Sequence, residues 1–513
     1  MPELLTEPGG LALVDWALLA LYAGATVGLG YYYSRKQSST DEYFIGTGRM
    51  NPTLVGFSLF ATLLSTISYL SIPGEAIGKG PIGFFGMLAL PVVYLVVGYW
   101  MIPLYMRRRV TSIYELLEDR LGVGIRLLGA TMFIALRLVW MSLLVYLAAV
   151  AMAVMLGVGP EMIPWIAGLT GFVAVVYTSL GGLRAVVITD LMQTLLMLGG
   201  GLLVIVLISY ELQGFGWIPT AWHPNWDRQP LFTFDPGTRV SLFGMVLSSI
   251  VWYICTAGGD QTAVQRFMAT GGAAAARRSL RTQLMVGATI GSILSLVGFA
   301  LLEYFTIRAD QLPVGISLSA NADKVFPRFI AFHLPAGVSG LVVAAMFAAA
   351  MSSLDSGLNS ISAVVTSDFL DRFRSRRLSE AERVRLAKLL AFGIGSVVVV
   401  GSTLIEGVPG NITAVTAKTT NLLVTPIFGL FFFAFFVPFA RPAGVVVGAA
   451  CGTITAALIA FSGPLFGMDP ETGLDPVSFM WIGPAALLVN IITGCAASLI
   501  LGRLARDYSD AGT

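Results

Sequence analysis

The sequence predicts an all-α integral membrane protein with about thirteen transmembrane helices, built around two inverted repeats of five helices each. Composition is the first reason, because 56% of the 513 residues are hydrophobic and only 12% are charged. The mean hydropathy of +0.81 lies far outside the range of soluble domains. The second reason is that apolar runs long enough to cross the hydrocarbon layer as helices recur along the whole chain. The third is a pair of interrupted helices, described below.

Hydropathy divides the chain into thirteen apolar segments with little room for a soluble domain between them. The expected spans are residues 11–33, 53–77, 83–106, 125–158, 161–180, 186–210, 241–267, 283–305, 337–370, 386–405, 410–440, 443–461 and 478–501. Together they form one transmembrane domain over residues 1–513.

The distribution of Lys and Arg predicts the orientation, since basic residues are retained on the cytoplasmic side of short loops. If the N-terminus lies outside, most basic residues fall in cytoplasmic loops, among them Arg107, Arg184, Arg266 and Arg441. The external loops then hold only Arg228, Arg239, Arg308, Lys324 and Arg328. We therefore expect a multi-pass plasma membrane protein with a cytoplasmic C-terminus, and the short soluble loops suit a bacterial inner membrane.

Two of the expected spans carry breaking residues. The second reads GFSLFATLLSTISYLSIPGEAIGKG, in which a Ser/Thr-rich middle precedes Pro73-Gly74, and the seventh reads SSIVWYICTAGGDQTAVQRF, in which Gly258-Gly259 precede Asp260. These spans are five apart and run in opposite directions, as an inverted repeat requires. The expected repeats are residues 53–210 and 241–440, with 11–33 and 443–501 peripheral. The alternative is that Gly and Pro are simply common in membrane helices.

The ninth span places a carboxylate among hydroxyl groups in the stretch MFAAAMSSLDSGLNSISAVVTSDF. Positions three and four apart share a helix face, so Ser352, Asp355, Ser356 and Asn359 form one polar stripe, with Ser353 beside it. Such a stripe cannot face lipid. In transporters with broken helices, ions and substrates bind where backbone carbonyls are released near mid-membrane.

At this point several motifs match a known family. They are DEYFIGTGRM before the second span, SLFATLLSTISYLSIPGEA within it, TSIYELLEDRLG after the third, YTSLGGLRAVVITDLMQ between the fifth and sixth, VQRFMA ending the seventh, and the ninth-span stretch quoted above. Over essentially its whole length the chain resembles the sodium:solute symporter family, with the best local likeness to its sialic acid branch. The resemblance implies a leucine-transporter-like fold and secondary-active, sodium-coupled import of a small polar solute by alternating access.

The resemblance also implies a sodium site shared by the family. Its ligands fall on the backbones of Ala61, Leu64 and Ala349 and on the hydroxyls of Ser352 and Ser353. Hydroxyl and carbonyl oxygens suit a hard cation. The alternative is that these small residues only let helices approach closely.

The sialic acid branch has a second sodium site, whose equivalents here are Asp190, Ser352, Asp355 and Ser356. Asp355 replaces a serine of that site. A buried carboxylate is costly unless it is paired, protonated or bound to a cation, so we hypothesise a second cation site at these four residues. The alternatives are a neutral Asp355 bonded to neighbouring hydroxyls, or proton coupling through Asp355 and Asp190.

The expected substrate position lies beside the two helix breaks. Its candidate residues are Ser65, Ser68, Trp140, Asp260, Gln261 and Lys418. Trp140 stands where the sialic acid branch has a carboxylate-binding Arg, Leu63 replaces a threonine that contacts sialic acid, and Met87 replaces a sugar-binding acid of the galactose branch. These departures argue against copying either substrate.

Charge within the spans ranks the substrate classes. Lys418 and Arg137 favour an organic acid or acidic sugar, ahead of a neutral sugar or polyol and then of an amino acid or quaternary amine. For Lys418 and Asp260, the alternative to a role in substrate binding is an internal salt bridge between the two side chains.

Other functional classes fit the sequence less well. With two histidines, His223 and His333, both expected in external loops, and no nucleophile–base set, an enzyme is not expected. No carbonyl filter motif indicates a channel. A transporter-like solute sensor would need an appended signalling domain, and few residues follow the last span. We expect sodium, a small solute and membrane lipid as partners, no other cofactor, no nucleic acid and no obligatory protein partner.

Overall fold

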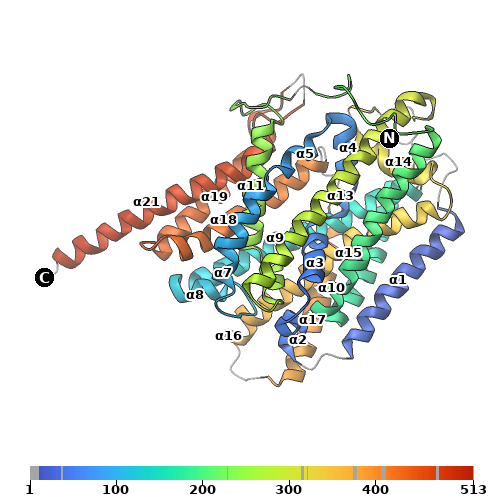
Figure 1. The fold of residues 1–513 in the computed structure, drawn as a ribbon. Helices are drawn as coiled ribbons and strands as arrows, with labels where there is room; N and C mark the ends of the chain where they lie inside the picture. Colours follow the sequence, from blue (N-terminus) through green and yellow to red (C-terminus); the bar gives the residue numbers. More distant parts are fainter. Residues whose placement is uncertain are drawn as a thin grey trace.

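The computed structural model describes residues 11–35, 39–156, 158–227, 229–312, 317–319, 322–373, 378–405, 412–469 and 473–511. Over these residues all regular secondary structure is helical, which confirms the predicted all-α class. Long helices run side by side through the body of the molecule (Figure 1). Of the expected basic loop residues, Arg228 lies outside the described residues.

Most long helices coincide with expected spans. They are α1 (Leu13–Ser34), α3 (Pro52–Leu63), α4 (Thr66–Lys79), α9 (Val123–Leu156), α10 (Ile163–Glu211), α11 (Leu242–Gly259), α13 (Ala273–Ile307), α15 (Val338–Val364), α17 (Glu380–Thr403), α18 (Ile412–Phe436), α19 (Pro442–Ala460) and α21 (Ile482–Ala511). Shorter helices complete or connect them. They are α2 (Thr40–Ile45), α5 (Ile82–Met87), α6 (Leu90–Leu95), η3 (Val96–Met101), α7 (Ile102–Tyr105), α8 (Glu115–Leu121), α12 (Gln261–Met268), α14 (Val325–Phe332), η7 (Val365–Leu370), α16 (Asp371–Phe373) and α20 (Ser462–Phe466).

The predicted count of thirteen spans is approximate. Among the described residues, 11 helices are long and apolar enough to cross a membrane, or up to 12 if each bent pair is one span. One of them, Pro160–Glu211, is 52 residues long and contains both expected spans 161–180 and 186–210. Gly182 divides it with φ 61° and ψ −176°, a conformation that only glycine adopts without strain. α10 therefore consists of two helices that meet at a kink at Gly182, one for each of the two expected spans.

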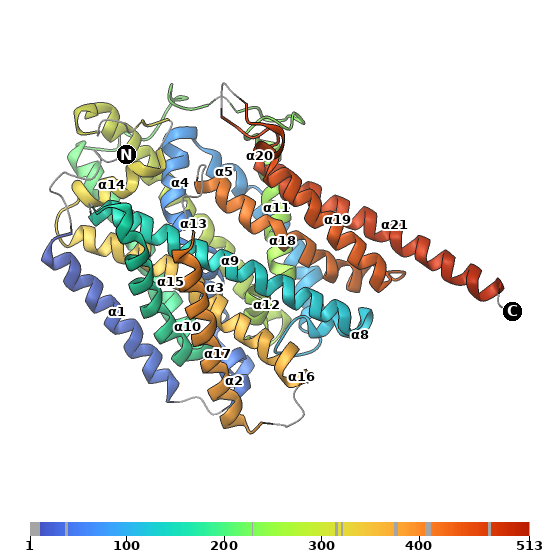
Figure 2. The same cartoon turned by 180° about the vertical axis from the view of Figure 1, so that it is seen from behind.

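α15 lies at the centre of the helices and is their most enclosed member. In its most apolar window 83% of the residues are buried, compared with 17% for α1. α1 lies along one edge of the molecule, whereas α19 and α21 pair with each other along the opposite edge (Figures 1 and 2). The polar stripe on α15 is thus inside the protein and away from lipid, as predicted. The division into two repeats and peripheral helices stays a prediction.

A buried carboxylate joins the edge helix α1 to α15. Asp15 is 1% exposed, and its Oδ1 accepts hydrogen bonds from the backbone N–H groups of Gly337 and Gly340, both at 2.7 Å. These amides belong to the N-terminus of α15, where the helix dipole favours a negative charge. α1 therefore caps the start of the helix that carries the polar stripe.

Candidate ion and substrate site

The first helix break lies between α3 and α4, which meet at a bend of 70°. Leu64 and Ser65 have extended backbones, and the Ser65 hydroxyl accepts a hydrogen bond from the Ser68 N–H to start α4. The predicted break at Pro73-Gly74 is wrong, because both residues lie inside α4. A proline removes only one donor from the helix, whereas the Ser65 N-cap starts a new helix well before it.

The second break separates α11 from α12 at Asp260. Asp260 has φ −98° and ψ 121°, and its carboxylate accepts a hydrogen bond from the Thr262 N–H at 2.8 Å. The expected break after Gly258-Gly259 is confirmed. A Cβ on Gly259 would come within 2.9 Å of the Phe428 backbone, so glycine also permits close packing of α11 on α18.

The five residues predicted for the family sodium site meet at the first break. The Ser352 hydroxyl lies 2.7 Å from the Ala61 carbonyl oxygen and 3.1 Å from that of Ala349. The Ser353 hydroxyl lies 3.2 Å from the Thr62 carbonyl and 3.5 Å from the Leu64 carbonyl. Ser352 and Ser353 are buried at 0% and 3% exposure. The released carbonyls of α3 and the hydroxyls of α15 thus form one oxygen-rich cluster.

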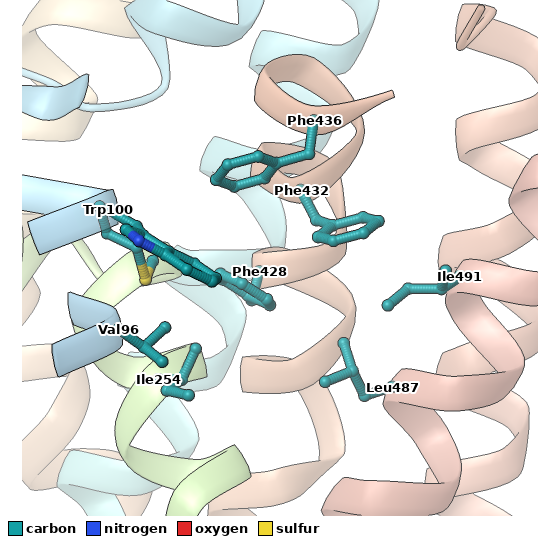
Figure 3. Close-up of a pocket in the computed structure, with 9 residues that line it drawn as sticks. Val96, Trp100, Ile254, Phe428, Phe432, Phe436, Leu487 and Ile491 are labelled. Atoms are coloured by element: carbon teal, nitrogen blue, oxygen red, sulfur yellow. The ribbon is translucent and has the colours of Figure 1, made fainter. Parts of the chain in front are cut away.

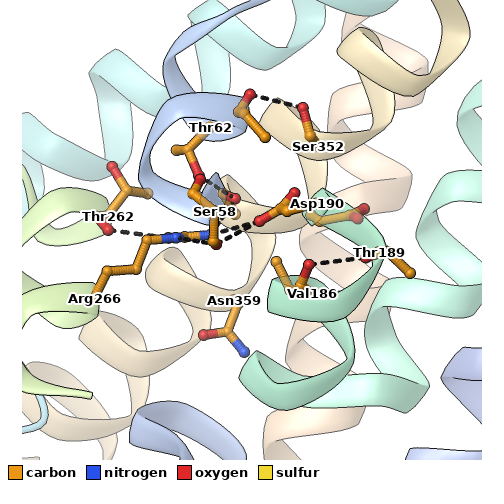
Figure 4. A network of polar contacts seen from close by, with 12 residues as sticks. Ser58, Thr62, Val186, Thr189, Asp190, Thr262, Arg266, Ser352 and Asn359 are labelled. Carbon is orange, nitrogen blue, oxygen red and sulfur yellow. Dashed lines mark hydrogen bonds and ion pairs between the residues drawn. The ribbon is translucent and has the colours of Figure 1, made fainter. Parts of the chain in front are cut away.

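Next to this cluster lies a buried guanidinium. Arg266 of α12 donates from Nε to the Ser58 hydroxyl at 2.7 Å and from Nη2 to the Ser356 hydroxyl. The same Nη2 lies 3.6 Å from Asp190 Oδ2, and Ser58 donates to that carboxylate at 2.5 Å. Figure 4 shows Arg266 reaching toward Ser58 and Asp190. The side chain is fully buried, so its assignment to a cytoplasmic loop was wrong.

Asp355 points toward α10. Its carboxylate accepts hydrogen bonds from the hydroxyls of Tyr177 and Thr178. Among the ion pairs of the described residues, none includes Asp355, although its side chain is 0% exposed. Of the four predicted second-site residues, Asp190 and Ser356 share Arg266, while Asp355 has separate partners. Asp355 is thus a buried carboxylate with two hydroxyl donors and no ion-pair partner among the described residues.

Comparison with known proteins identifies the family. The model of the sodium:solute symporter family matches residues 43–452. The chain belongs to the sodium:solute symporter family. It is 28% identical to the sodium/sialic acid symporter SiaT of Proteus mirabilis, with 94% of each chain covered, and 30% identical to the symporter NanT of Aliivibrio fischeri, with 88% of each covered.

Solved structures agree with this assignment. A substrate-bound, outward-open Na+-coupled sialic acid symporter superposes with a TM-score of 0.78 at 26% identity, covering 95% of this chain and 98% of the other. Mhp1, a transporter of the nucleobase-cation-symport-1 family, superposes with a TM-score of 0.52 at 13% identity over 89% of this chain and 95% of that one, which shows a shared fold alone. The predicted leucine-transporter-like architecture is confirmed.

In this symporter the charged substrate candidates have partners that sequence reasoning missed. Asp260 pairs with Arg137 of α9, which also donates to the Thr262 hydroxyl at 2.8 Å. Lys418 pairs instead with Asp475 at 2.5 Å, so the alternative Lys418–Asp260 salt bridge is wrong. Asp475 lies in an irregular segment before α21, and no pattern in the sequence identified it as a partner of Lys418. Arg137, by contrast, was recognisable as a lone charge within an apolar span.

The uncharged candidates divide into two groups. Trp140 is 7% exposed and belongs to the same buried cluster as Ile67 of α4, which adjoins Ser68 in sequence. Trp140 and Ser68 therefore lie in the same region near the first break. Ser65 and Ser68 place their hydroxyls 3.3 Å apart. Gln261 does not join them, because its amide bonds the Ile113 N–H and the Thr111 carbonyl in the loop before α8.

Proposed function

We propose that this symporter couples sodium influx to the uptake of a small organic acid or acidic sugar by alternating access. The observation that carries the proposal is the meeting of the Ser352 and Ser353 hydroxyls with the carbonyls released at the α3–α4 break. Neutral oxygen ligands suit Na+ because they replace its hydration shell without a compensating buried anion. The relatives named for sodium-coupled sialic acid symport support both the ion and the solute class.

The second cation site stays a more specific proposal, centred on Asp355. A carboxylate at 0% exposure without a basic partner among the described residues is stabilised further by a bound cation or a proton. Binding of one ion by Asp355, Ser356 and Asp190 together requires Arg266 to leave the latter two. Proton coupling through Asp355 is the second candidate, favoured by the hydrogen bonds from Tyr177 and Thr178.

For the solute, the Arg137–Asp260 pair at the second break provides one group of each sign. A substrate carboxylate would compete with Asp260 for the guanidinium, while a hydroxyl or amino group would bind Asp260. An organic acid or acidic sugar would bind both Arg137 and Asp260. A neutral sugar or polyol would bind by hydrogen bonds alone, and an amino acid or quaternary amine would depend on Asp260. We infer a plasma membrane location with the N-terminus outside and the C-terminus cytoplasmic, and no enzymatic activity.

The test is thermal unfolding of the purified protein with carboxylates, acidic and neutral sugars, amino acids and quaternary amines, each in sodium and in potassium buffer. A substrate should raise the melting midpoint only in sodium, because ligands that bind the folded state stabilise it by mass action. Ser352→Ala combined with Ser353→Ala should weaken the apparent sodium affinity by roughly a hundredfold or more, since each of the two lost polar ligands costs about 1.5–3 kcal/mol.

Ser362→Ala is the matched control, because this buried hydroxyl of α15 bonds only the Leu358 carbonyl one turn away. It should leave the sodium affinity unchanged. Arg137→Gln should abolish stabilisation by acids and leave sodium binding intact. Equal stabilisation in sodium and potassium would contradict the sodium assignment and return Asp355 to consideration as a proton carrier.

A further inference from the structure

An apolar groove of about 310 Å³ opens on the side of the helix bundle, between α18 and α21. Phe428, Phe432 and Phe436 line it at successive turns of α18, Leu487 lines it from α21, and Trp100 of η3 closes the side facing α11 (Figure 3). Apart from the Trp100 indole, the lining side chains are hydrocarbons or thioethers.

This groove faces the bilayer. Trp100 is 68% exposed, Phe436 is 44% exposed and neighbouring Leu488 is 60% exposed. Side chains this apolar are exposed only where lipid replaces water as the solvent. The groove is thus a recess in the lipid-facing surface and is separate from the polar cluster around α15.

Three arginines lie near the end of the groove that is formed by the C-terminus of α18. Arg120 of α8 donates to the Pro438 carbonyl, two residues beyond Phe436. Arg441 follows at the start of α19 and donates to the Leu501 carbonyl of α21 at 3.3 Å. On the far side Arg277 lies over the Tyr99 ring, at 4.9 Å from its centroid, beside Trp100.

These arginines have no carboxylate to neutralise them among the described residues. Arg120, Arg277 and Arg441 take part in none of the ion pairs found there, and their guanidinium groups contact two carbonyls and a tyrosine ring. Asp119, which adjoins Arg120 in sequence, pairs with Arg108 at 2.8 Å. One end of an apolar recess is therefore positively charged.

We propose that this groove binds one anionic phospholipid, with an acyl chain against Phe428 and Phe432 and the headgroup phosphate on Arg120 and Arg441. Charge complementarity selects an anionic lipid over a zwitterionic one, because guanidinium groups bind phosphate oxygens in a bidentate manner. The apolar recess selects a lipid over a free phosphate. The bound lipid fills the space between α21 and α18, and it is independent of the sodium and solute sites.

The experiment measures the melting midpoint of the detergent-purified chain with added phosphatidylglycerol, phosphatidylcholine or glycerol 3-phosphate. Phosphatidylglycerol should raise the midpoint by at least about 2 °C more than phosphatidylcholine, and glycerol 3-phosphate should have no effect. Arg120→Gln combined with Arg441→Gln should remove this difference. Leu487→Trp, which fills the groove, should remove it as well.

Two matched controls separate the site from general surface effects. Arg35→Gln combined with Arg385→Gln removes the same charge from exposed positions on α1 and α17. Leu169→Trp adds the same ring at a lipid-facing residue of α10 that is 69% exposed. Both should keep the full phosphatidylglycerol effect.

Equal effects of the two lipids, or equal losses in test and control variants, overturn the proposal. Stabilisation by glycerol 3-phosphate alone would mean a phosphate site without a role for the groove. Because a variant can fail to fold, native mass spectrometry of the unmodified protein provides a second measurement. It should show one retained phosphatidylglycerol per chain, and retention of phosphatidylcholine to the same extent contradicts the proposal.

Discussion

Asp355 shows how one side chain changes the chemistry of a familiar site. It occupies a position on α15 next to Ser356, yet its carboxylate turns to Tyr177 and Thr178 of α10. Arg266 occupies the other side of Ser356 and lies 3.6 Å from Asp190. Around the two helix breaks, Asp190 and Asp260 thus have arginine partners, whereas Asp355 has none among the described residues. A cation bound at Asp355 would neutralise the negative charge of this third carboxylate.

At the residue scale we expect Asp355→Asn to lower the cooperativity of sodium activation of uptake, with the Hill coefficient falling toward about 1, because one of two linked cations is lost. The amide keeps the size of the side chain and removes its charge. Tyr177→Phe is the control, since it removes a donor and keeps the carboxylate, and it should preserve the cooperativity. Uptake that continues without sodium but depends on a pH gradient would instead establish proton coupling.

Among the helices, close packing relies on glycine where two elements must approach. α19 carries Gly444, Gly448 and Gly452 at four-residue spacing on the face toward α21. A Cβ on Gly448 would lie 2.7 Å from the Asn490 carbonyl oxygen and 3.0 Å from the Gly494 Cα. These neighbours are backbone atoms that cannot rotate away. Small residues at this spacing are a common means of helix association in membranes.

At this scale Gly448→Ala should destabilise the protein by about 1–3 kcal/mol, because the added methyl forces α19 and α21 apart. The measurement is the melting midpoint in detergent. Gly199→Ala is the matched control, since a Cβ at this helical position of α10 meets nothing within 4 Å. It should be neutral or slightly stabilising. Similar losses for both variants would argue against the close contact of the two helices.

Across the whole molecule, an ion-pair network at the arginine-rich end joins four elements, α8, α9, η7 and α16. Arg126 at the start of α9 pairs with Asp368 of η7 at 2.6 Å and with Glu118 of α8 at 2.8 Å. Arg372 of α16 reaches the same Glu118 at 2.9 Å. The hydrogen bond from Arg126 holds the pKa of Glu118 below its ordinary value of 4.5. Glu118 thus connects α8 to the far end of the α15 span.

The sign of the pH dependence follows from this direction. A carboxyl whose pKa is lowered on folding stabilises the folded state above its unfolded pKa, and this contribution is lost as the pH falls through the folded value. Glu118→Gln should lower the melting midpoint at neutral pH by an amount corresponding to less than about 1 kcal/mol, since the group is partly exposed. The difference from wild type should shrink as the pH falls below 4.5 and through the lowered pKa of folded Glu118. Glu161→Gln, an exposed glutamate, should show no such pH-dependent difference.

The accuracy of the sequence-based prediction differs from residue to residue within the site. The polar stripe of the ninth span indicated that Ser352 and Ser353 lie in the interior, and the family resemblance implied their place at a break in the second span. The break was predicted at Pro73, but α4 accommodates this proline in its interior and begins after its N-cap Ser65. Arg266 was assigned to a loop because only its position near a span end was visible. Its partner Asp190 lies far away in the chain.

The sequence by itself determined that the chain is a helical membrane protein with two interrupted spans, and it determined which hydroxyls line its interior. Lipid enforces these features locally, because every exposed backbone group must be satisfied within its own helix and apolar residues must cover the surface. Only the tertiary structure decided which charges meet: Arg137 with Asp260, Lys418 with Asp475, Arg266 with Asp190, and Asp355 with hydroxyls alone. Ion pairing depends on distances between side chains of different helices, and periodicity along one helix contains no information about its neighbours.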